Sequence, residues 1–521
     1  MNFSSDLARK VLHACAYGLL SVALLVGAAF AQRGLNRDRD RLGMTRVTPL
    51  ENAPPVLAFT TVALGGFRGL ISNALWMRMN DLQEEDKFFE MAQLADWITK
   101  LEPHFIQVWI HQAWNMSYNI SVKFKDAADR WRWVKRGIEL IRDEGLKYNP
   151  NEPLLYRELA WHFQHKMGQD LDDANRFYKQ QWANEMATVL GTNKPNLDEL
   201  VAPQTAETRG RADLLRTKYK IDPALMKEVD QRYGPLEWRL PEAHAIYWGA
   251  AGLKNAEQNP TKISADDLIT LRRAIYQSML MSFHRGRLVV NPFEKRFEMS
   301  PNLAIIGKVN SAYEQAMNED EKNRDHIAKA HRNFLRDAVY FLYGYNRQTD
   351  AAKWYAYLAK RYPKQNLVDG DPKSVPTTMT YDEYAIGRLQ EDIGETDAKR
   401  ITGAVQGLLF SSYSSLALGE DDRAAGLKLL AHKIYDRYGA KTKESEVRIG
   451  LPPFNDLEKE VVKNLLDPEE GLPAEARAVV RTALRLPPEP PPRPKPAVSP
   501  PPANSSTNAP PRTNSAATLQ P

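Results

Sequence analysis

The feature that most limits the fold of this chain is a run of 22 residues, Val11 to Gln32, that contains no Asp, Glu, Lys or Arg. A helix needs about 20 apolar residues to cross the hydrocarbon core of a bilayer. The run is therefore long enough to span a membrane once. The sequence predicts an N-terminal transmembrane segment within residues 1–32.

The same run has a second interpretation. Ala29-Phe30-Ala31 follows an apolar stretch and a short basic start, which is the pattern of a cleaved signal peptide. The run is long for a signal peptide, which favours an uncleaved anchor. Basic residues after it, such as Arg33 and Arg37, favour a cytoplasmic C-terminal side, whereas the signal-like start and the long following domain favour export. We expect a single-pass protein whose soluble part lies outside the cytoplasm.

Composition limits what can follow the anchor. The 521 residues are 43% hydrophobic and 26% charged, so disorder over the whole chain is excluded. Cys15 is the only cysteine, which excludes a disulfide framework and a cysteine-based zinc site. Lys and Arg number 70 against 65 Asp and Glu, a balance that gives no indication of nucleic-acid binding. We expect neither a nucleic-acid partner nor a cofactor.

Apolar residues recur at helical spacing over most of the remaining chain, which predicts an all-α fold. A second apolar stretch, Asn52 to Phe67, is short for another span and is either a first buried helix or an interfacial segment. Breaks rich in Pro, Gly, Asn and Thr separate the helical regions. The predicted order is a juxtamembrane linker at 33–57, a helical domain at 58–190, a linker at 191–222, a second helical region at 223–363, a loop at 364–380, a C-terminal helical region at 381–486 and a tail at 487–521.

The last 35 residues, 487–521, contain 13 prolines together with Ser, Asn, Ala and Thr. Such a composition cannot bury a core. It predicts a tail that is disordered or partly polyproline II. The tail is either a spacer or a ligand for a proline-reading domain.

One helical segment has a spacing that is typical of a known repeat. Tyr156, Leu159, Ala160 and Phe163 follow one another at intervals of 3, 1 and 3. The aromatic residue fills the gap between repeats, and the small residue lets the paired helix approach closely. This segment resembles the first helix of a tetratricopeptide (TPR) repeat. The match is good in one repeat, partial in three and irregular in spacing, over about half the chain. The resemblance implies a divergent TPR-like α-solenoid of antiparallel helix pairs.

In TPR proteins the first helix of each repeat lines a concave groove, so the resemblance implies a groove here. On a wheel of about 100° per residue, polar and aromatic side chains of two segments, 104–120 and 154–167, fall outside the apolar arc. Such side chains can hydrogen-bond to a peptide or a sugar, or stack on it; alternatively, they contact a neighbouring helix. The candidate binding residues are His111, Asn115, Tyr118, Glu158, Trp161, His162 and His165.

Glu158, His162 and His165 lie at i, i+4 and i+7 and could offer three metal ligands. This spacing gives an alternative function, a metal-dependent or glycan-acting enzyme of the cell envelope. A metal site usually needs ligands from more than one element, however, and the sequence contains neither an HExxH motif nor a nucleophile elbow. We therefore expect no catalysis and predict a membrane-anchored TPR-like scaffold that binds a protein or peptide. A third interpretation is an accessory subunit of a membrane complex.

Overall fold

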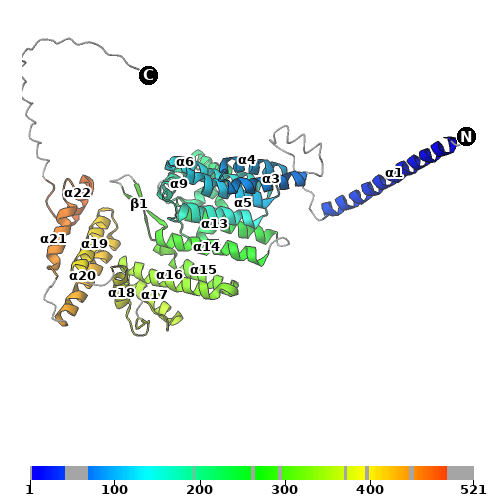
Figure 1. The fold of residues 1–521 in the computed structure, drawn as a ribbon. Coiled ribbons are helices and arrows are strands. Elements are labelled where there is room, and N and C mark those ends of the chain that lie inside the picture. The colour runs from blue at the N-terminus through cyan, green and yellow to red at the C-terminus, as the bar shows by residue number, and fades with distance from the viewer. Residues whose placement is uncertain are drawn as a thin grey trace, which may run out of the picture. The chain divides into compact units, whose positions relative to one another are not determined.

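The computed structural model describes residues 3–41, 68–191, 194–259, 264–291, 296–368, 372–393, 398–444 and 451–489. These residues are mostly helical, and they divide into two compact units, Met1–Asp397 and Ala398–Pro521 (Figure 1). The predicted all-α class is therefore confirmed at the level of secondary structure.

The first helix, α1 (Phe3–Arg41), contains the uncharged N-terminal run. Its segment Ala16–Leu35 has 20 residues and a mean hydropathy of 1.5, and none of that segment is buried against the rest of the described chain. By length and composition it could cross a membrane, a test that an N-terminal signal sequence also passes. Because α1 continues through Arg41, the start of the predicted linker at 33–57 is helical. Residues 42–67, with the second apolar stretch, lie outside the described residues.

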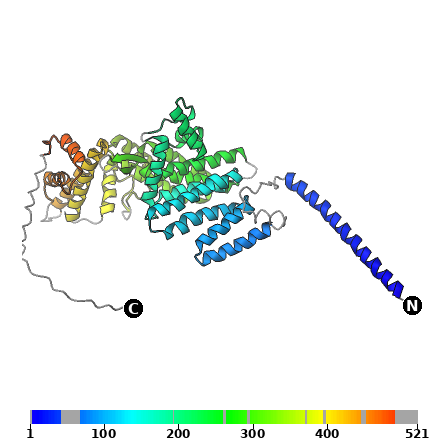
Figure 2. The same ribbon diagram turned by 90° about the horizontal axis from the view of Figure 1, so that it is seen from above.

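After α1, the described part of the first unit continues with helices that pack on their neighbours in sequence (Figure 2). Met79, Met91 and Ile98 are fully buried among these first helices. The helical segments up to residue 190 are α3 (Arg68–Glu84), α4 (Phe88–Leu101), α5 (Ile106–Trp114), η3 (Ser121–Lys123), α6 (Ala127–Glu139), α7 (Leu146–Tyr148), α8 (Pro153–Trp161) and α9 (Asn175–Leu190).

Local sequence determines where these helices start. The carboxylate of Asp126 accepts hydrogen bonds from the backbone N–H groups of Ala128 and Asp129, both at 3.2 Å, and so caps α6. Pro153 occupies the first position of α8, where its missing N–H is not needed. Such caps satisfy N–H groups that have no partner inside the helix.

Three helices change their hydrogen-bonding pattern near their C-terminal ends. α5, α6 and α8 continue as the π-helices η2 (Asn115–Ile120), η4 (Leu140–Gly145) and η5 (His162–Gly168). In a π-helix the bonds run from i to i+5, and such segments are rare and frequent at functional sites. Side chains that follow each α-to-π transition point in other directions than they would if the α-helix had continued. A wheel of 100° per residue therefore assigns their faces incorrectly.

The segment 191–222 differs from the predicted linker because it contains α10 (Leu197–Val201) and α11 (Ala206–Thr217). Thr205 and Thr208 form a reciprocal capping box at the start of α11. Ala212 and Leu215 are fully buried. Polar composition in this segment thus reflects helix caps and exposed faces rather than the absence of structure.

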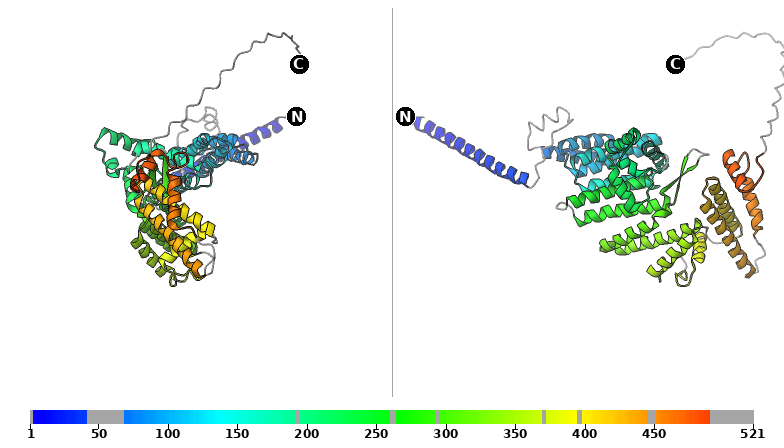
Figure 3. Two further views of the ribbon diagram at one scale, coloured as in Figure 1. Left: turned by 90° about the vertical axis from the view of Figure 1, so that its left-hand side faces the viewer. Right: turned by 180° about the vertical axis from the view of Figure 1, so that it is seen from behind.

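Beyond this segment, α13 to α17 pack in chain order, and α13 also packs against α8 and η5. Figures 1 and 3 show α13, α14 and α15 as successive layers. The two helical regions predicted from sequence therefore share one compact unit. Its remaining helices are α12 (Pro223–Tyr233), α13 (Pro241–Gln258), α14 (Ala265–Arg285), η7 (Leu303–Ile305), α15 (Ile306–Glu319), η8 (Glu321–Asn323), α16 (Arg324–Gly344), α17 (Gln348–Arg361) and α18 (Tyr381–Ile393).

A β-hairpin, β1 (Arg287–Asn291) with β2 (Arg296–Ser300), interrupts the helical order after α14. The strands are antiparallel, with Arg287 opposite Ser300. They are the only strands in the described part of the chain. The sequence analysis did not predict them, because each strand has only five residues and the pair lies between long helical segments.

The second unit contains α19 (Ala398–Ala417), α20 (Asp421–Glu444), α21 (Phe454–Leu465) and α22 (Ala474–Ala483). α19 packs against the other three helices. Gly419, at φ 74°, makes the turn into α20, a conformation that glycine adopts without steric cost. Tail residues 490–521 lie outside the described residues.

Close packing of α6 on η2 gives a first prediction. A β-carbon at Gly137 would lie 2.8 Å from the carbonyl oxygen of Ala113 and still nearer to the Ser117 hydroxyl. Gly137→Ala should therefore destabilise the protein by about 1–3 kcal/mol. Gly210→Ala, in an exposed turn of α11 with open space around it, should stabilise by up to about 1 kcal/mol. Urea unfolding measures the free energy of unfolding of both variants. If both substitutions changed it equally, the close packing at Gly137 would be contradicted.

The N-terminal helix gives a second prediction. If α1 is an uncleaved anchor, the protein stays in the membrane fraction after an alkaline wash and its purified mass includes residues 1–32. A variant that lacks residues 3–41 should move to the soluble fraction. A membrane-free protein that begins after Ala31 would instead show that the run is a signal peptide.

Candidate functional site

The structure divides the seven predicted binding residues into buried and partly exposed groups. Asn115, Glu158 and His162 are 0%, 3% and 0% exposed, so the prediction that they face a free groove is wrong. The amide of Asn115 donates to the backbone oxygen of Phe88 in α4 at 3.2 Å. Glu158 lies in α8, which packs against both α13 and α14. The Nδ1 atom of His162 lies 2.8 Å from the backbone oxygen of Glu158.

His111 is partly exposed but belongs to a different surface. Its Nε2 atom lies 3.3 Å from the side-chain oxygen of Gln83, and its ring meets that of Trp76 edge to face at 5.5 Å. Both partners are in α3. Burial lowers the pKa of His111, which keeps the ring neutral at physiological pH. His111 therefore fixes α5 on α3.

The other three residues come together with a fourth that the sequence analysis missed. Trp114 stacks on Tyr118 with ring centroids 5.6 Å apart, Tyr118 meets His165 at 5.8 Å, and His165 stacks on Trp161 at 4.4 Å. Trp114 is 38% exposed, and the other three are partly exposed. We call these four residues the aromatic ladder. Tyr118 lies in η2 and His165 in η5, so two π-helices place its central rungs.

A hydrogen bond fixes the two central rungs. The Tyr118 hydroxyl lies 3.0 Å from Nδ1 of His165. Burial, reinforced by the charge of Glu158, raises the pKa of Tyr118. Burial, reinforced by the charge of Lys166, lowers the pKa of His165. At neutral pH the hydroxyl therefore keeps its proton and the imidazole is uncharged, and the hydrogen bond between them holds both rings in one orientation.

A buried ion network lies beneath the ladder. The ammonium group of Lys166 sits 4.9 Å from the centre of the Tyr118 ring and donates to Asp172 at 2.6 Å. Arg130 donates to the same carboxylate at 2.7 Å, and Tyr178 does so at 3.2 Å. These four residues, the Asp172 network, come from α6, η5, α9 and the loop between η5 and α9. One carboxylate thus joins three helices under the ladder.

The charges of the Asp172 network depend on one another. Burial alone would raise the pKa of Asp172, but the hydrogen bonds from Lys166 and the Ala174 backbone, together with the charges of Lys166 and Arg130, hold that pKa below its usual value. Burial lowers the pKa of Lys166, against the hydrogen bond and charge of Asp172. Removal of the carboxylate would leave the buried Lys166 without an acidic partner and Arg130 with Asp173 alone, which is strongly unfavourable.

The alternative metal site is not supported. No group of three or more His, Cys, Asp or Glu side chains among the described residues could hold a metal ion. Nδ1 of His162 bonds to the backbone of Glu158, and Nδ1 of His165 bonds to Tyr118. The i, i+4, i+7 spacing fails because η5 begins at His162, which turns His165 towards η2.

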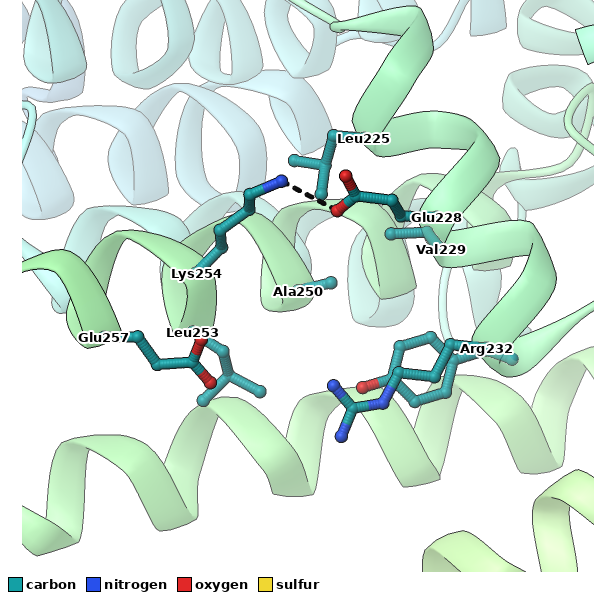
Figure 4. Close-up of a pocket in the computed structure, with 9 residues that line it drawn as sticks. Leu225, Glu228, Val229, Arg232, Ala250, Leu253, Lys254 and Glu257 are labelled. Atoms are coloured by element: carbon teal, nitrogen blue, oxygen red, sulfur yellow. Dashed lines mark hydrogen bonds and ion pairs between the residues drawn. The ribbon is translucent and has the colours of Figure 1, made fainter. Parts of the chain in front are cut away.

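A pocket of about 170 Å³ lies elsewhere, where α12 meets α13 (Figure 4). Glu228 and Lys254 form an ion pair of 2.7 Å at one side of it. Arg232 and Glu257 approach from opposite sides, and neither has an ion-pair partner in the described part of the chain. Both are exposed surface residues. The pocket contains none of the predicted residues, and the ladder remains the stronger candidate.

The chemistry of the ladder is that of binding. Aromatic faces stack on flat or ring-shaped groups, and indole N–H groups donate hydrogen bonds. No family model, curated protein or solved structure matches this chain. The functional assignment therefore depends on the geometry of the ladder and its support.

Sequence reasoning found three rungs of the ladder but not their support. Trp114, which directly follows the fully buried Ala113 in α5, is not among the predicted binding residues. Arg130, Lys166 and Asp172 were missed because they lie on different segments. A single signal was present: Lys166 follows three residues after Phe163, on the apolar side of the helix, where a charged residue needs a buried partner.

The Asp172 network gives a third prediction. A carboxyl whose pKa is lowered by folding stabilises the protein at neutral pH, and that contribution is lost as pH falls below its usual value of 3.8. Asp172→Asn should cost about 3–5 kcal/mol at pH 7 and should flatten the acid end of the stability curve. The matched control is Asp173→Asn, because Asp173 also binds Arg130, at 2.6 Å, but is 84% exposed. In the control variant the free energy of unfolding should fall by at most about 1 kcal/mol.

Urea unfolding of the two variants between pH 3 and pH 7 measures how much each substitution lowers the free energy of unfolding. Equal losses in the two variants would show that the buried carboxylate does not hold the three helices together.

Proposed function

We propose that this protein is a membrane-anchored helical scaffold that binds a segment of a partner protein on the aromatic ladder. The observation that supports the proposal is a set of four adjacent, partly exposed rings, of which the central two lie in π-helices above a buried ion network. Trp and Tyr are enriched at the centres of protein interfaces. Rings that are already fixed lose little further freedom on binding. A scaffold of this kind needs no catalytic group.

We also infer that the first unit is a divergent TPR-like solenoid. Helices α13 to α17 pack in chain order, as stacked repeats do. Three of the residues with TPR spacing, Leu159, Ala160 and Phe163, are buried in α8 and η5. Tyr156 contacts the next layer, with its ring centroid 6.4 Å from that of Trp248 in α13. These contacts support the TPR-like interpretation.

The anchor and the ladder together suggest where the scaffold acts. We infer that α1 stays in the membrane and that the soluble part lies outside the cytoplasm. The ladder would then meet proteins of the cell envelope. In this arrangement the protein is the binding subunit of a membrane complex, which unites two of the interpretations drawn from the sequence.

A fourth prediction tests this function. The full chain, purified from its host membranes under mild detergent, should recover a defined set of proteins. Trp114→Ala and Trp161→Ala should each reduce that recovery by about tenfold, since aromatic anchors typically contribute more than 1 kcal/mol to binding. Trp354→Ala is the matched control, because Trp354 is also partly exposed but lies in α17. Quantitative mass spectrometry of the recovered proteins gives the ratio.

Equal recovery by the ladder variants and the control would show that the ladder is not the surface that binds the partner. Circular dichroism and melting temperature, measured on the same samples, distinguish lost binding from lost folding.

A further inference from the structure

Two adjoining pockets form one groove on the first unit. The pocket of about 170 Å³ between α12 and α13 (Figure 4) meets a smaller one of about 30 Å³, whose walls also come from α14 and α15. Arg232, Tyr233 and Leu253 line both pockets and therefore lie where the two meet. We call the two pockets together the α12–α13 groove. Drug-sized ligands occupy roughly 300–1,000 Å³, so this groove suits a smaller molecule.

The groove carries two opposite charges that have no ion-pair partner. Arg232 lies four residues after Glu228 in α12. Glu257 lies three residues after Lys254 in α13. Residues at these spacings are neighbours on a helix and could pair. Glu228 and Lys254 instead pair with each other across the two helices, at 2.7 Å. This leaves Arg232 and Glu257 unpaired among the described residues, on opposite sides of the pocket in Figure 4.

Beside Arg232 the groove offers a second hydrogen-bond donor. Tyr233 is only 9% exposed, yet its hydroxyl has no hydrogen-bond partner among the described residues. The guanidinium of Arg232 lies 5.2 Å from the centre of the Tyr233 ring, which keeps the two groups together. Burial raises the pKa of Tyr233, so the hydroxyl stays protonated at neutral pH. A guanidinium and a hydroxyl in this arrangement can donate to one carboxylate.

The surface between the two unpaired charges is apolar. Val229 of α12 and Ala250 and Leu253 of α13 are buried side chains that line it. Figure 4 shows Leu253 between Arg232 and Glu257. From Ala250 to Glu257 the helix rises about 10 Å, at 1.5 Å per residue. A ligand that reaches both charges therefore needs an apolar middle several carbon atoms long.

We propose that the α12–α13 groove binds a molecule with a carboxylate at one end, an ammonium group at the other and a short chain of methylene groups between them. The carboxylate accepts hydrogen bonds from Arg232 and Tyr233, the ammonium group donates to Glu257, and the methylene chain packs on Leu253. A free ω-amino acid and a polypeptide that ends in lysine share this chemistry. A ligand with one charged end binds less well, because it leaves the other charge of the groove unpaired. The groove contains no residue of the aromatic ladder, so the inference does not depend on the proposed function.

Calorimetry on the full chain in detergent tests the groove, with 6-aminohexanoate as the probe. Hexanoate and hexylamine, which each lack one end group, should bind about tenfold more weakly than the probe. Arg232→Ala, Tyr233→Phe and Glu257→Gln should each weaken binding of the probe by about five- to tenfold, since each removes a hydrogen bond to a charged group. The matched controls are Arg132→Ala in α6 and Glu90→Gln in α4, both exposed, which should leave binding unchanged.

The one-ended ligands distinguish a binding role from a structural one. Glu257→Gln should weaken binding of 6-aminohexanoate but not that of hexanoate. Arg232→Ala should weaken binding of 6-aminohexanoate but not that of hexylamine. Melting temperatures, measured on the same samples, show that the variants are folded. The inference is overturned if 6-aminohexanoate does not bind at concentrations up to about 10 mM, or if the groove variants and the controls bind it equally.

Peptides distinguish the two sources of the ligand. One is an acetylated tripeptide that ends in lysine with a free carboxylate, and the other is the same tripeptide with its carboxyl group amidated. If the first binds as tightly as 6-aminohexanoate and the second does not, the ligand is the C-terminus of a polypeptide. If neither peptide binds but 6-aminohexanoate does, the ligand is a free ω-amino acid. Trp114→Ala should change none of these affinities, so failure of the ladder to bind a partner would leave this inference intact.

Discussion

The buried carboxylate of Asp172 is the interaction on which the candidate site depends. It accepts hydrogen bonds from Arg130, Lys166 and Tyr178, which come from three different helical segments. Each cation would be costly to bury alone, and each is stabilised because the carboxylate is present. The ammonium group of Lys166 in turn lies against the ring of Tyr118. The position of the ladder is thus set by an electrostatic balance below it as well as by apolar packing.

The π-helices explain why such a surface can form between two ordinary helices. An α-helix would carry His165 away from Tyr118, but the i to i+5 pattern of η5 brings it to 3.0 Å from the hydroxyl. The π-helical geometry of η5 is stabilised by two sets of contacts: the ion pair of Lys166 with Asp172, and the packing of η5 on α13. Stiff support of this kind favours binding, since the rings need no further ordering when a ligand arrives.

Much of the fold could be predicted from the sequence because helical periodicity is local. The uncharged run at 11–32, the helices of residues 68–190 and the TPR-like spacing in α8 follow from the identity and order of neighbouring residues. The hairpin at 287–300 was not predicted, since the stability of such short strands depends on packing against their neighbours rather than on their own residues. The helices at 197–217 were missed because their caps resemble loop composition.

The sequence by itself determined that this chain is helical and carries one apolar segment long enough for a membrane, because both properties depend on residues close together in the chain. It also identified Tyr118, Trp161 and His165 as candidates. Only the tertiary structure decided that these three meet Trp114, while Asn115, Glu158 and His162 are buried. The reason is physical: burial and ion pairing depend on helices that are distant in sequence, and a change from α- to π-helix alters which face each side chain occupies.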